Sequence, residues 1–201
     1  MATRLAPSDD THTFEEFLEA YDGVHAEWVD GKVFVMSPNS TAHTRLIRLL
    51  NSVLQYYAEK KKLGEIFVPG LPMRTSERAG CEPDVFFVRR ERLNLVREGF
   101  FDGPADLAIE IISRESRSRD RGEKFREYEK GGVSEYWLID PERKVAEAYR
   151  LGAGGTYEAV PLGDPPALRS EALPGAWIAV EWLWRDPLPE QWWVHKEWGL
   201  I

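Results

Sequence analysis

The sequence is short of features that would point to a secreted or membrane protein. It has a single cysteine, Cys81, so neither an intrachain disulfide nor a thiolate zinc cluster can form. No run approaches the ~20 consecutive apolar residues of a membrane-spanning helix. Residues 1–10 also lack the apolar core of a signal peptide. We therefore expect a cytoplasmic protein with no membrane association.

Positive charge is also scarce. The 201 residues include 26 Lys and Arg against 34 Asp and Glu, which gives a formal net charge of -8. Sequence-independent affinity for nucleic acids comes from Lys and Arg that displace counterions from the phosphates. The overall balance therefore argues mildly against DNA as a partner, and only a locally basic surface could reverse that argument.

The remaining composition is that of an ordinary globular protein. Hydrophobic residues make up 43% and charged residues 30% of the chain, and a domain of this length buries roughly 70% of the surface of its unfolded chain. We expect one domain over residues 1–201, with a loose start at 1–13 and a Trp-rich C-terminal tail at 185–201.

Hydrophobic periodicity and turn residues predict alternating helices and strands. A helix at 13–21 begins with a capping box of Thr13 and Glu16, and Asp30-Gly31 predicts a β-hairpin. The other expected elements are helices at 40–63 and 118–130, strands at 65–68, 84–88, 107–112, 135–140 and 144–150, a hairpin around 152–155, and a short strand and helix after 173. This order predicts an α/β fold, a mixed central β-sheet flanked by helices.

Two acidic residues are candidates for chemistry. Glu110 interrupts the otherwise apolar strand LAIEII, and a buried carboxylate must be paired, protonated or bound to a cation. A structural salt bridge is the competing explanation. Asp84 opens the strand after Pro83, where a lone Asp is most often a turn or cap residue. Together they could hold Mg²⁺ (or Mn²⁺), with the backbone carbonyl of Ile111 as a further ligand.

The same residues resemble a known signature. Pro83-Asp84 followed by Glu110-Ile111-Ile112 is similar to the motif of the PD-(D/E)XK nuclease superfamily, except that the superfamily's lysine belongs at position 112. The segments VDGKVFVMSPNSTAHTRLI, EPDVFFV, DLAIEIISRESRSRDRGEKFREYEK and the late LPG resemble the Uma-two family of restriction-endonuclease-like proteins. The resemblance runs from about Glu16 to Trp184. It implies a restriction-endonuclease-like core with a metal site and names no substrate.

The helix at 118–130 offers a replacement for the missing lysine. Lys124 and Tyr128 are four residues apart and share one face, and the resemblance places this helix directly after the Glu110 strand. Lys124 could then orient the attacking water or stabilise the pentavalent phosphate. The alternative is a surface lysine paired with Asp120.

Glu27 and His43 are two further candidate site residues. The resemblance puts an acid at Glu27, where superfamily members hold a second metal or a metal-bound water; a surface strand position is the alternative. His43 could contact phosphate or water, although a histidine near a helix start is more often a cap or surface residue.

Two wider patterns concern nucleic acid. Basic residues crowd 114–130 but alternate with acidic ones, so the stretch could steer phosphate or simply carry intrahelical ion pairs. The tryptophans near the C-terminus could stack on bases, but we expect them to pack an end of the domain or a dimer partner. These tryptophans are Trp182, Trp184, Trp192, Trp193 and Trp198.

The leading hypothesis is a Mg²⁺- or Mn²⁺-dependent endonuclease that hydrolyses phosphodiester bonds in DNA. We expect a homodimer, because a two-fold axis presents two sites to antiparallel strands. The alternative is a catalytically inactive nuclease fold used for nucleic-acid binding or protein assembly, which the negative net charge favours.

Overall fold

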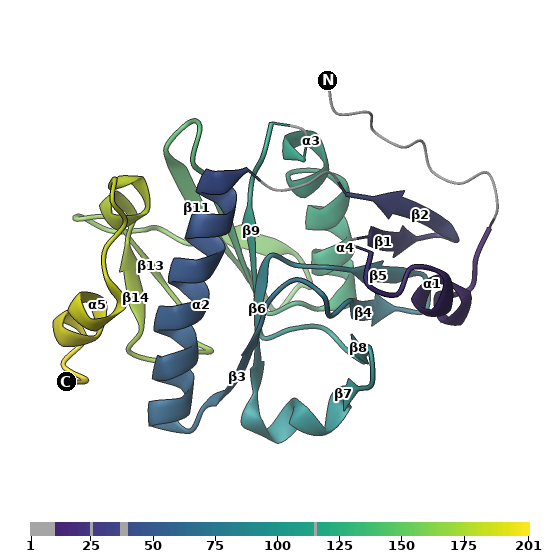
Figure 1. Ribbon diagram of the computed structural model, residues 1–201, viewed down its shortest axis with the longest axis horizontal. Helices are drawn as coiled ribbons and strands as arrows, with labels where there is room; N and C mark the ends of the chain where they lie inside the picture. Colours follow the sequence, from purple (N-terminus) through teal and green to yellow (C-terminus); the bar gives the residue numbers. More distant parts are fainter. Residues whose placement is uncertain (1–10, 25, 37–39, 115) are drawn as a thin grey trace.

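The fold is organised around a mixed six-stranded sheet (Figure 1). The computed structural model describes residues 11–24, 26–36, 40–114 and 116–201. In spatial order the strands of this central sheet are β12 (Tyr157–Ala159), β11 (Val145–Leu151), β10 (Glu135–Asp140), β9 (Leu107–Ile111), β6 (Val85–Arg89) and β3 (Gly64–Phe67). β9 and β10 run parallel and the other neighbours antiparallel. The predicted mixed sheet is therefore confirmed.

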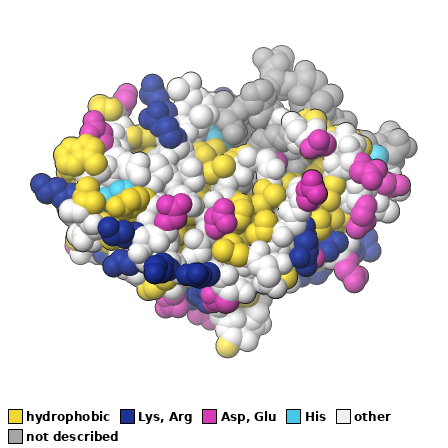
Figure 2. Space-filling view, turned by 60° about the horizontal axis from the view of Figure 1, so that its bottom comes forward, with side chains coloured by type: hydrophobic (Ala, Val, Ile, Leu, Met, Phe, Trp, Pro, Cys, Tyr) yellow, Lys and Arg dark blue, Asp and Glu magenta, His cyan; other side chains and the backbone are white. Residues whose placement is uncertain are grey.

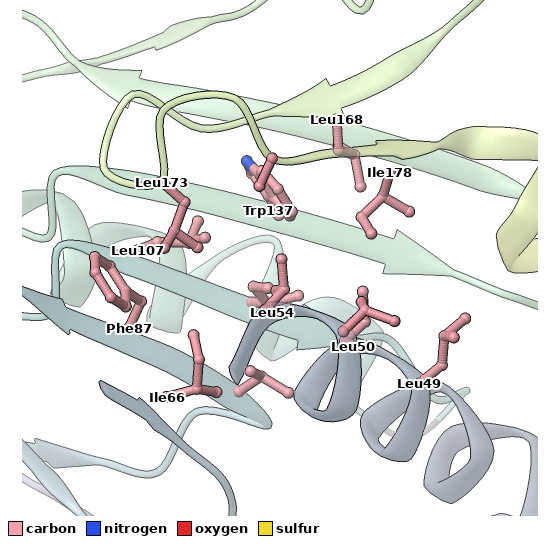
Figure 3. Packing of buried hydrophobic residues seen from close by; sticks show 14 of the residues in the cluster. Leu49, Leu50, Leu54, Ile66, Phe87, Leu107, Trp137, Leu168, Leu173 and Ile178 are labelled. Atoms are coloured by element: carbon pink, nitrogen blue, oxygen red, sulfur yellow. The ribbon is translucent and has the colours of Figure 1, made fainter. Parts of the chain in front are cut away.

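One face of the central sheet is covered by the long helix α2 (Thr41–Lys61). Leu50 and Leu54 of this helix are fully buried and point toward Leu107 and Trp137 of the sheet (Figure 3). Each such side chain contributes about 1.5–3 kcal/mol through the apolar surface that it removes from water. Because α2 is fixed along the sheet, the residues of its first turn are held at one end of strands β6 and β9.

The chain after β12 closes the same core. β13 (Ala167–Arg169) pairs with β14 (Trp177–Ala179), and η2 (Val180–Trp184) and α5 (Gln191–Glu197) follow. Trp182 is buried against Trp177 and Trp193, and the indole of Trp198 donates to the carbonyl of Trp177. The tail therefore packs one end of the domain, as predicted, while Trp192 is 54% exposed.

A second six-stranded sheet and a helix cover the opposite face. The sheet has the order β2 (Lys32–Val35), β1 (Ala26–Val29), β5 (Ala79–Cys81), β4 (Met73–Ser76), β8 (Phe100–Phe101) and β7 (Val96–Arg97). β1 and β2 form the hairpin predicted at Asp30-Gly31. The other four strands lie in segments that the sequence predicted as connections. η1 (Arg90–Leu95) precedes β7.

The N-terminal helix α1 (Phe14–Ala20) packs on β1 and β2 and has the predicted capping box. The hydroxyl of Thr13 accepts from Glu16 N–H and the Glu16 carboxylate accepts from Thr13 N–H. Residues 1–10 of the predicted loose start lie outside the described residues. His12 is tied to the hairpin, because its N–H donates to the carbonyl of Gly31.

The single helix predicted at 118–130 is wrong. The structure has two helices, α3 (Arg117–Asp120) and α4 (Glu123–Gly131), separated at Gly122. Gly122 has φ −124° and ψ −83°, which is not helical, and a Cβ there would lie 2.7 Å from the Ser118 carbonyl oxygen. The glycine therefore allows a close backbone approach that redirects the chain between the two helices.

The surface carries both signs of charge. On the face in Figure 2, Lys and Arg side chains gather toward the lower left, hydrophobic side chains lie across the middle, and Asp and Glu are interspersed. This face therefore lacks the uniform positive field that attracts a phosphate backbone over a wide area. Within the described ranges, no helix is both long enough and apolar enough to cross a membrane.

Candidate active site

Buried polar side chains from both sheets and three helices meet where β6 begins and β9 ends. We call this group the Lys124 cluster. Its members are Glu27, His43, Asp84, Glu110, Arg119, Asp120, Lys124 and Tyr128. No member other than Arg119 is more than 6% exposed, and the Arg119 side chain is 11% exposed. So many buried charges require mutual compensation, because isolated burial of one charge is costly.

Asp84 and Glu110 are brought together by strand register. β6 and β9 pair antiparallel with Val85 opposite Ile109. Asp84 directly precedes this pair on one strand and Glu110 directly follows it on the other, and Asp84 Oδ2 accepts from the N–H of Ile111. The two predicted metal ligands therefore lie near each other at one end of the sheet.

Lys124 reaches Glu110 from helix α4. Its Nζ lies 2.6 Å from Glu110 Oε1 and 2.7 Å from Glu27 Oε1, and it donates to the backbone carbonyl of Glu82 at 3.2 Å. Ile112, on the same strand face as Glu110, is buried in the apolar cluster that contains Tyr128. The competing interpretation of Lys124 as a surface residue paired with Asp120 is wrong, because the lysine is only 4% exposed.

Glu27 comes from the second sheet. Its Oε2 lies 2.9 Å from Arg119 Nη2, and its Oε1 accepts from the N–H of Glu82 at 3.3 Å as well as pairing with Lys124. The alternative of a surface strand position is wrong, because Glu27 is 2% exposed. Burial raises the pKa of Glu27, but the cations Lys124 and Arg119 outweigh it, so the pKa lies below its usual value.

His43 is attached to Asp84. The ring Nε2 lies 2.8 Å from Asp84 Oδ1, and the other oxygen, Oδ2, accepts from the backbone N–H of Ile111 at 2.7 Å. The expectation that His43 caps the helix or lies on the surface is wrong. Ser40 caps α2, and His43 is 6% exposed. The Ile111 contact places the backbone of that residue beside Asp84, while its carbonyl as a metal ligand stays a prediction.

Tyr128 and Lys124 do lie on one face of α4, as predicted. The hydroxyl of Tyr128 donates to Glu110 Oε1 at 2.7 Å. Burial and the adjacent Glu110 raise the pKa of Tyr128 well above its usual value, so the phenol keeps its proton and remains a donor. Tyr128 thus helps to fix the carboxylate that Lys124 pairs with.

The cluster has more acids than cations. Among the described residues, Glu27, Asp84, Glu110 and Asp120 face two cations, Lys124 and Arg119. Burial raises the pKa of Glu110 well above its usual value, and the neighbouring acids raise it further against the opposing effect of Lys124. Burial also raises the pKa of Asp120. A further cation beside Glu110 would relieve this excess of negative charge.

Asp84 and Glu110 offer oxygen donors, the kind of ligand that a hard divalent cation prefers. Mg²⁺ commonly takes one or two carboxylates and completes its octahedral shell with waters and substrate phosphate. The carboxylate oxygens of Asp84 and Glu110 are donors of this chemical type. In the part of the chain that the structure describes, no three His, Cys, Asp or Glu side chains converge as a metal-binding group.

Comparison with known proteins shows the family of the chain. The model of the Uma2 family, described as "Putative restriction endonuclease", matches residues 14–181. The chain belongs to the Uma2 family. A solved structure described as a "putative nuclease belonging to DUF820 from Anabaena variabilis" is 19% identical, with a TM-score of 0.72 over 86% of this chain and 97% of that chain. No curated protein matches the sequence.

The Uma2 assignment supports a nuclease-like protein, and the structural match establishes the restriction-endonuclease-like α/β fold. Two members of the cluster, Arg119 and Asp120, were not recognised from the sequence as site residues, although their close spacing with Lys124 in RDRGEK was an available signal. A further contact, the backbone carbonyl of Glu82 that accepts from Lys124, was also missed. A backbone acceptor gives no signal in the sequence.

A surface hollow of about 710 Å³ lies away from these residues. It is lined by Lys62, Arg89 and Arg90 among others, and contains no member of the Lys124 cluster. Arg89 ends the strand that begins next to Asp84, so about 16 Å of β6 separates the hollow from the cluster.

Proposed function

We propose that this Uma2 protein is a Mg²⁺- or Mn²⁺-dependent endonuclease that hydrolyses phosphodiester bonds in DNA. The observation that carries the proposal is the placement of Lys124, whose Nζ lies 2.6 Å from Glu110 Oε1 although the lysine expected at position 112 is absent. A buried acid pair supports the proposal because its oxygens could hold a divalent ion, and an adjacent lysine could stabilise charge on the phosphoryl group.

In this proposal Asp84 and Glu110 hold the cation, with the Ile111 carbonyl as a further ligand. When bound, the divalent ion supplies Lewis-acid chemistry: it lowers the pKa of a water and neutralises charge that builds up on the phosphoryl oxygens. His43 and Ile111 N–H fix the Asp84 carboxylate, and Tyr128 fixes that of Glu110. These contacts hold the ligand oxygens in place before substrate arrives.

Lys124 acts as a fixed positive charge. Burial alone would lower the pKa of Lys124, but Glu110 and Glu27 raise it above its usual value, so the ammonium keeps its proton. In this proposal it does not serve as the general base. Its task is to orient the attacking water or to stabilise negative charge on the pentavalent phosphate through its N–H groups. In-line attack would leave a 3′-hydroxyl and a 5′-phosphate.

The decisive experiment is cleavage by the purified full chain of single- and double-stranded DNA and RNA with Mg²⁺ or Mn²⁺. We expect DNA cleavage that Asp84→Asn and Glu110→Gln each reduce by about 10²-fold or more, with ends that a ligase accepts. Asp106→Asn is the matched control. Asp106 is also a buried acid held by an arginine, Arg92, but it lies at the other end of β9.

A folded wild type that cleaves none of these substrates with either metal would contradict the proposal. It would favour the alternative, a nuclease fold used for binding or assembly, which the net charge of -8 supports. The same preparations test the proposed homodimer by light scattering at several concentrations. The lone, buried Cys81 supports the proposed cytoplasmic location, because a reducing compartment needs no disulfides.

A further inference from the structure

The two oxygens of Glu27 are both held by cations. Oε1 lies 2.7 Å from Lys124 Nζ, and Oε2 lies 2.9 Å from Arg119 Nη2. The side chain of Glu27 is 2% exposed, so these ion pairs are shielded from solvent. A carboxylate already neutralised by a lysine and an arginine has little attraction left for a divalent ion.

Neither of the acids proposed as metal ligands is paired with two cations among the described residues, as Glu27 is. Asp84 is bonded by a histidine and a peptide N–H, with neither lysine nor arginine among its described ion-pair partners. For Glu110, the contacts from Lys124 and Tyr128 both go to Oε1, and within the described residues no such bond goes to Oε2. Metal-binding capacity is therefore concentrated on these two residues.

We propose that Glu27, anchored by Arg119, is the positioning residue of Lys124 and not a metal ligand, so that the site takes a single divalent cation. The metal part of this inference rests on the proposed function; the positioning part does not. Arg119 ties Glu27 of β1 to helix α3, and Glu27 in turn ties Lys124 of α4 to the second sheet. The ammonium is thereby directed toward Glu110 from a helix.

The metal part is tested by titrating the full chain with Mn²⁺ and following the free-ion signal by electron paramagnetic resonance. We expect a single Mn²⁺ per chain in the wild type and in Glu27→Gln, with affinities that differ by about tenfold or less. Asp84→Asn should abolish binding, and Asp106→Asn should leave it unchanged. Two ions in the wild type, one of them lost in Glu27→Gln, would overturn the inference.

The positioning part is tested without metal. A buried ammonium held by three oxygens exchanges its protons slowly, so Lys124 should give a distinct ¹H–¹⁵N lysine signal that Lys124→Met removes. We expect Glu27→Gln and Arg119→Met to shift or lose this signal. Arg119→Lys should largely restore it, and the control Asp106→Asn should not alter it.

An unchanged Lys124 signal in folded Glu27→Gln and Arg119→Met would refute the positioning role. If Glu27→Gln fails to fold, the Lys124 signal is compared between Arg119→Met and Arg119→Lys. A signal that is lost or shifted in the first and restored in the second supports the positioning role. A wild type that binds no Mn²⁺ would contradict the proposed function and the single-cation statement, while the lysine signal would still decide the role of Glu27.

Discussion

Lys124 Nζ lies 2.6 Å from Glu110 Oε1 although the two residues belong to a helix and a strand that are separated by a loop and a second short helix. The same ammonium lies 2.7 Å from Glu27 Oε1 on the other sheet. One side chain therefore joins the central sheet, the second sheet and α4. Its removal should affect both the stability of the fold and the chemistry of the site.

Lys124→Met should lower the free energy of unfolding by about 3–5 kcal/mol, because it leaves buried carboxylates without their shared cation. DNA cleavage should fall as well. Urea denaturation at neutral pH measures the first effect, and the cleavage assay measures the second. Lys130→Met is a control for the substitution itself, because Lys130 lies on the same helix, α4, and is not buried.

The double variant Glu27→Gln/Lys124→Met tests whether the ion pair itself stabilises the fold, as opposed to the packing of each side chain. If the ion pair causes the loss of unfolding free energy in the two single variants, the double variant should be more stable than the sum of their losses predicts, by about 1–3 kcal/mol. Strict additivity would indicate that the two side chains contribute independently, against the 2.7 Å contact.

His43→Ala should weaken Mn²⁺ binding by about 10–100-fold, because the histidine fixes the Asp84 carboxylate through Oδ1. Isothermal titration calorimetry measures this effect. His195→Ala is the matched control. That histidine is also buried, but it contacts the Val53 carbonyl and stacks on Tyr56. Equal metal affinities in wild type and His43→Ala would remove His43 from the site.

The sequence predicted those parts of the site that depend on local pattern. Glu110 was conspicuous in an apolar strand, and the spacing of Lys124 and Tyr128 was enough to place them on one helix face. The contacts of Glu27 with Arg119 and Lys124 could not be predicted, because they depend on how the second sheet packs on the first. Such non-local contacts leave no periodic signal in the chain.

Most of the second sheet was not predicted from the sequence, because only its β1–β2 hairpin was expected. β5 consists of Ala79, Gly80 and Cys81, which have low strand propensity or little bulk, and β4 is four residues long. Gly80 is required there because a Cβ would lie 2.4 Å from the Phe14 ring. Gly80 therefore weakens the strand pattern in the sequence, and the same residue lets helix α1 pack against β5.

Tyr128→Phe should lower the free energy of unfolding by about 2 kcal/mol, because a buried hydrogen bond to a carboxylate is lost. Tyr136→Phe is the comparison. The hydroxyl of Tyr136 is also fully buried but donates to the neutral backbone carbonyl of Asp120 at 3.1 Å. We expect about 1 kcal/mol for that change. A larger loss for Tyr136→Phe would argue that Glu110 does not carry a full charge in the folded protein.

Stability at low pH should depend on Asp140, at the end of β10. Burial alone would raise the pKa of Asp140, but hydrogen bonds from Arg117 and from the N–H of Arg143 outweigh it, so the pKa lies below its usual value. The unfolded chain therefore takes up this proton first as the pH falls. The stabilisation is complete above the unfolded-state pKa, about 3.9, and is lost as the pH falls through the folded-state pKa.

Asp140→Asn should accordingly lower the free energy of unfolding by about 2 kcal/mol at pH 7, because the Arg117 guanidinium loses its anionic acceptor and can donate only to a neutral amide oxygen. The gap between variant and wild type should narrow below about pH 4, where the carboxylate of the unfolded wild-type chain takes up its proton before that of the folded chain. Urea denaturation at pH 7 and pH 3 measures both values, with the exposed Asp22→Asn as control. A gap that stays constant from pH 7 to pH 3 would mean that Asp140 acts through packing rather than through its charge.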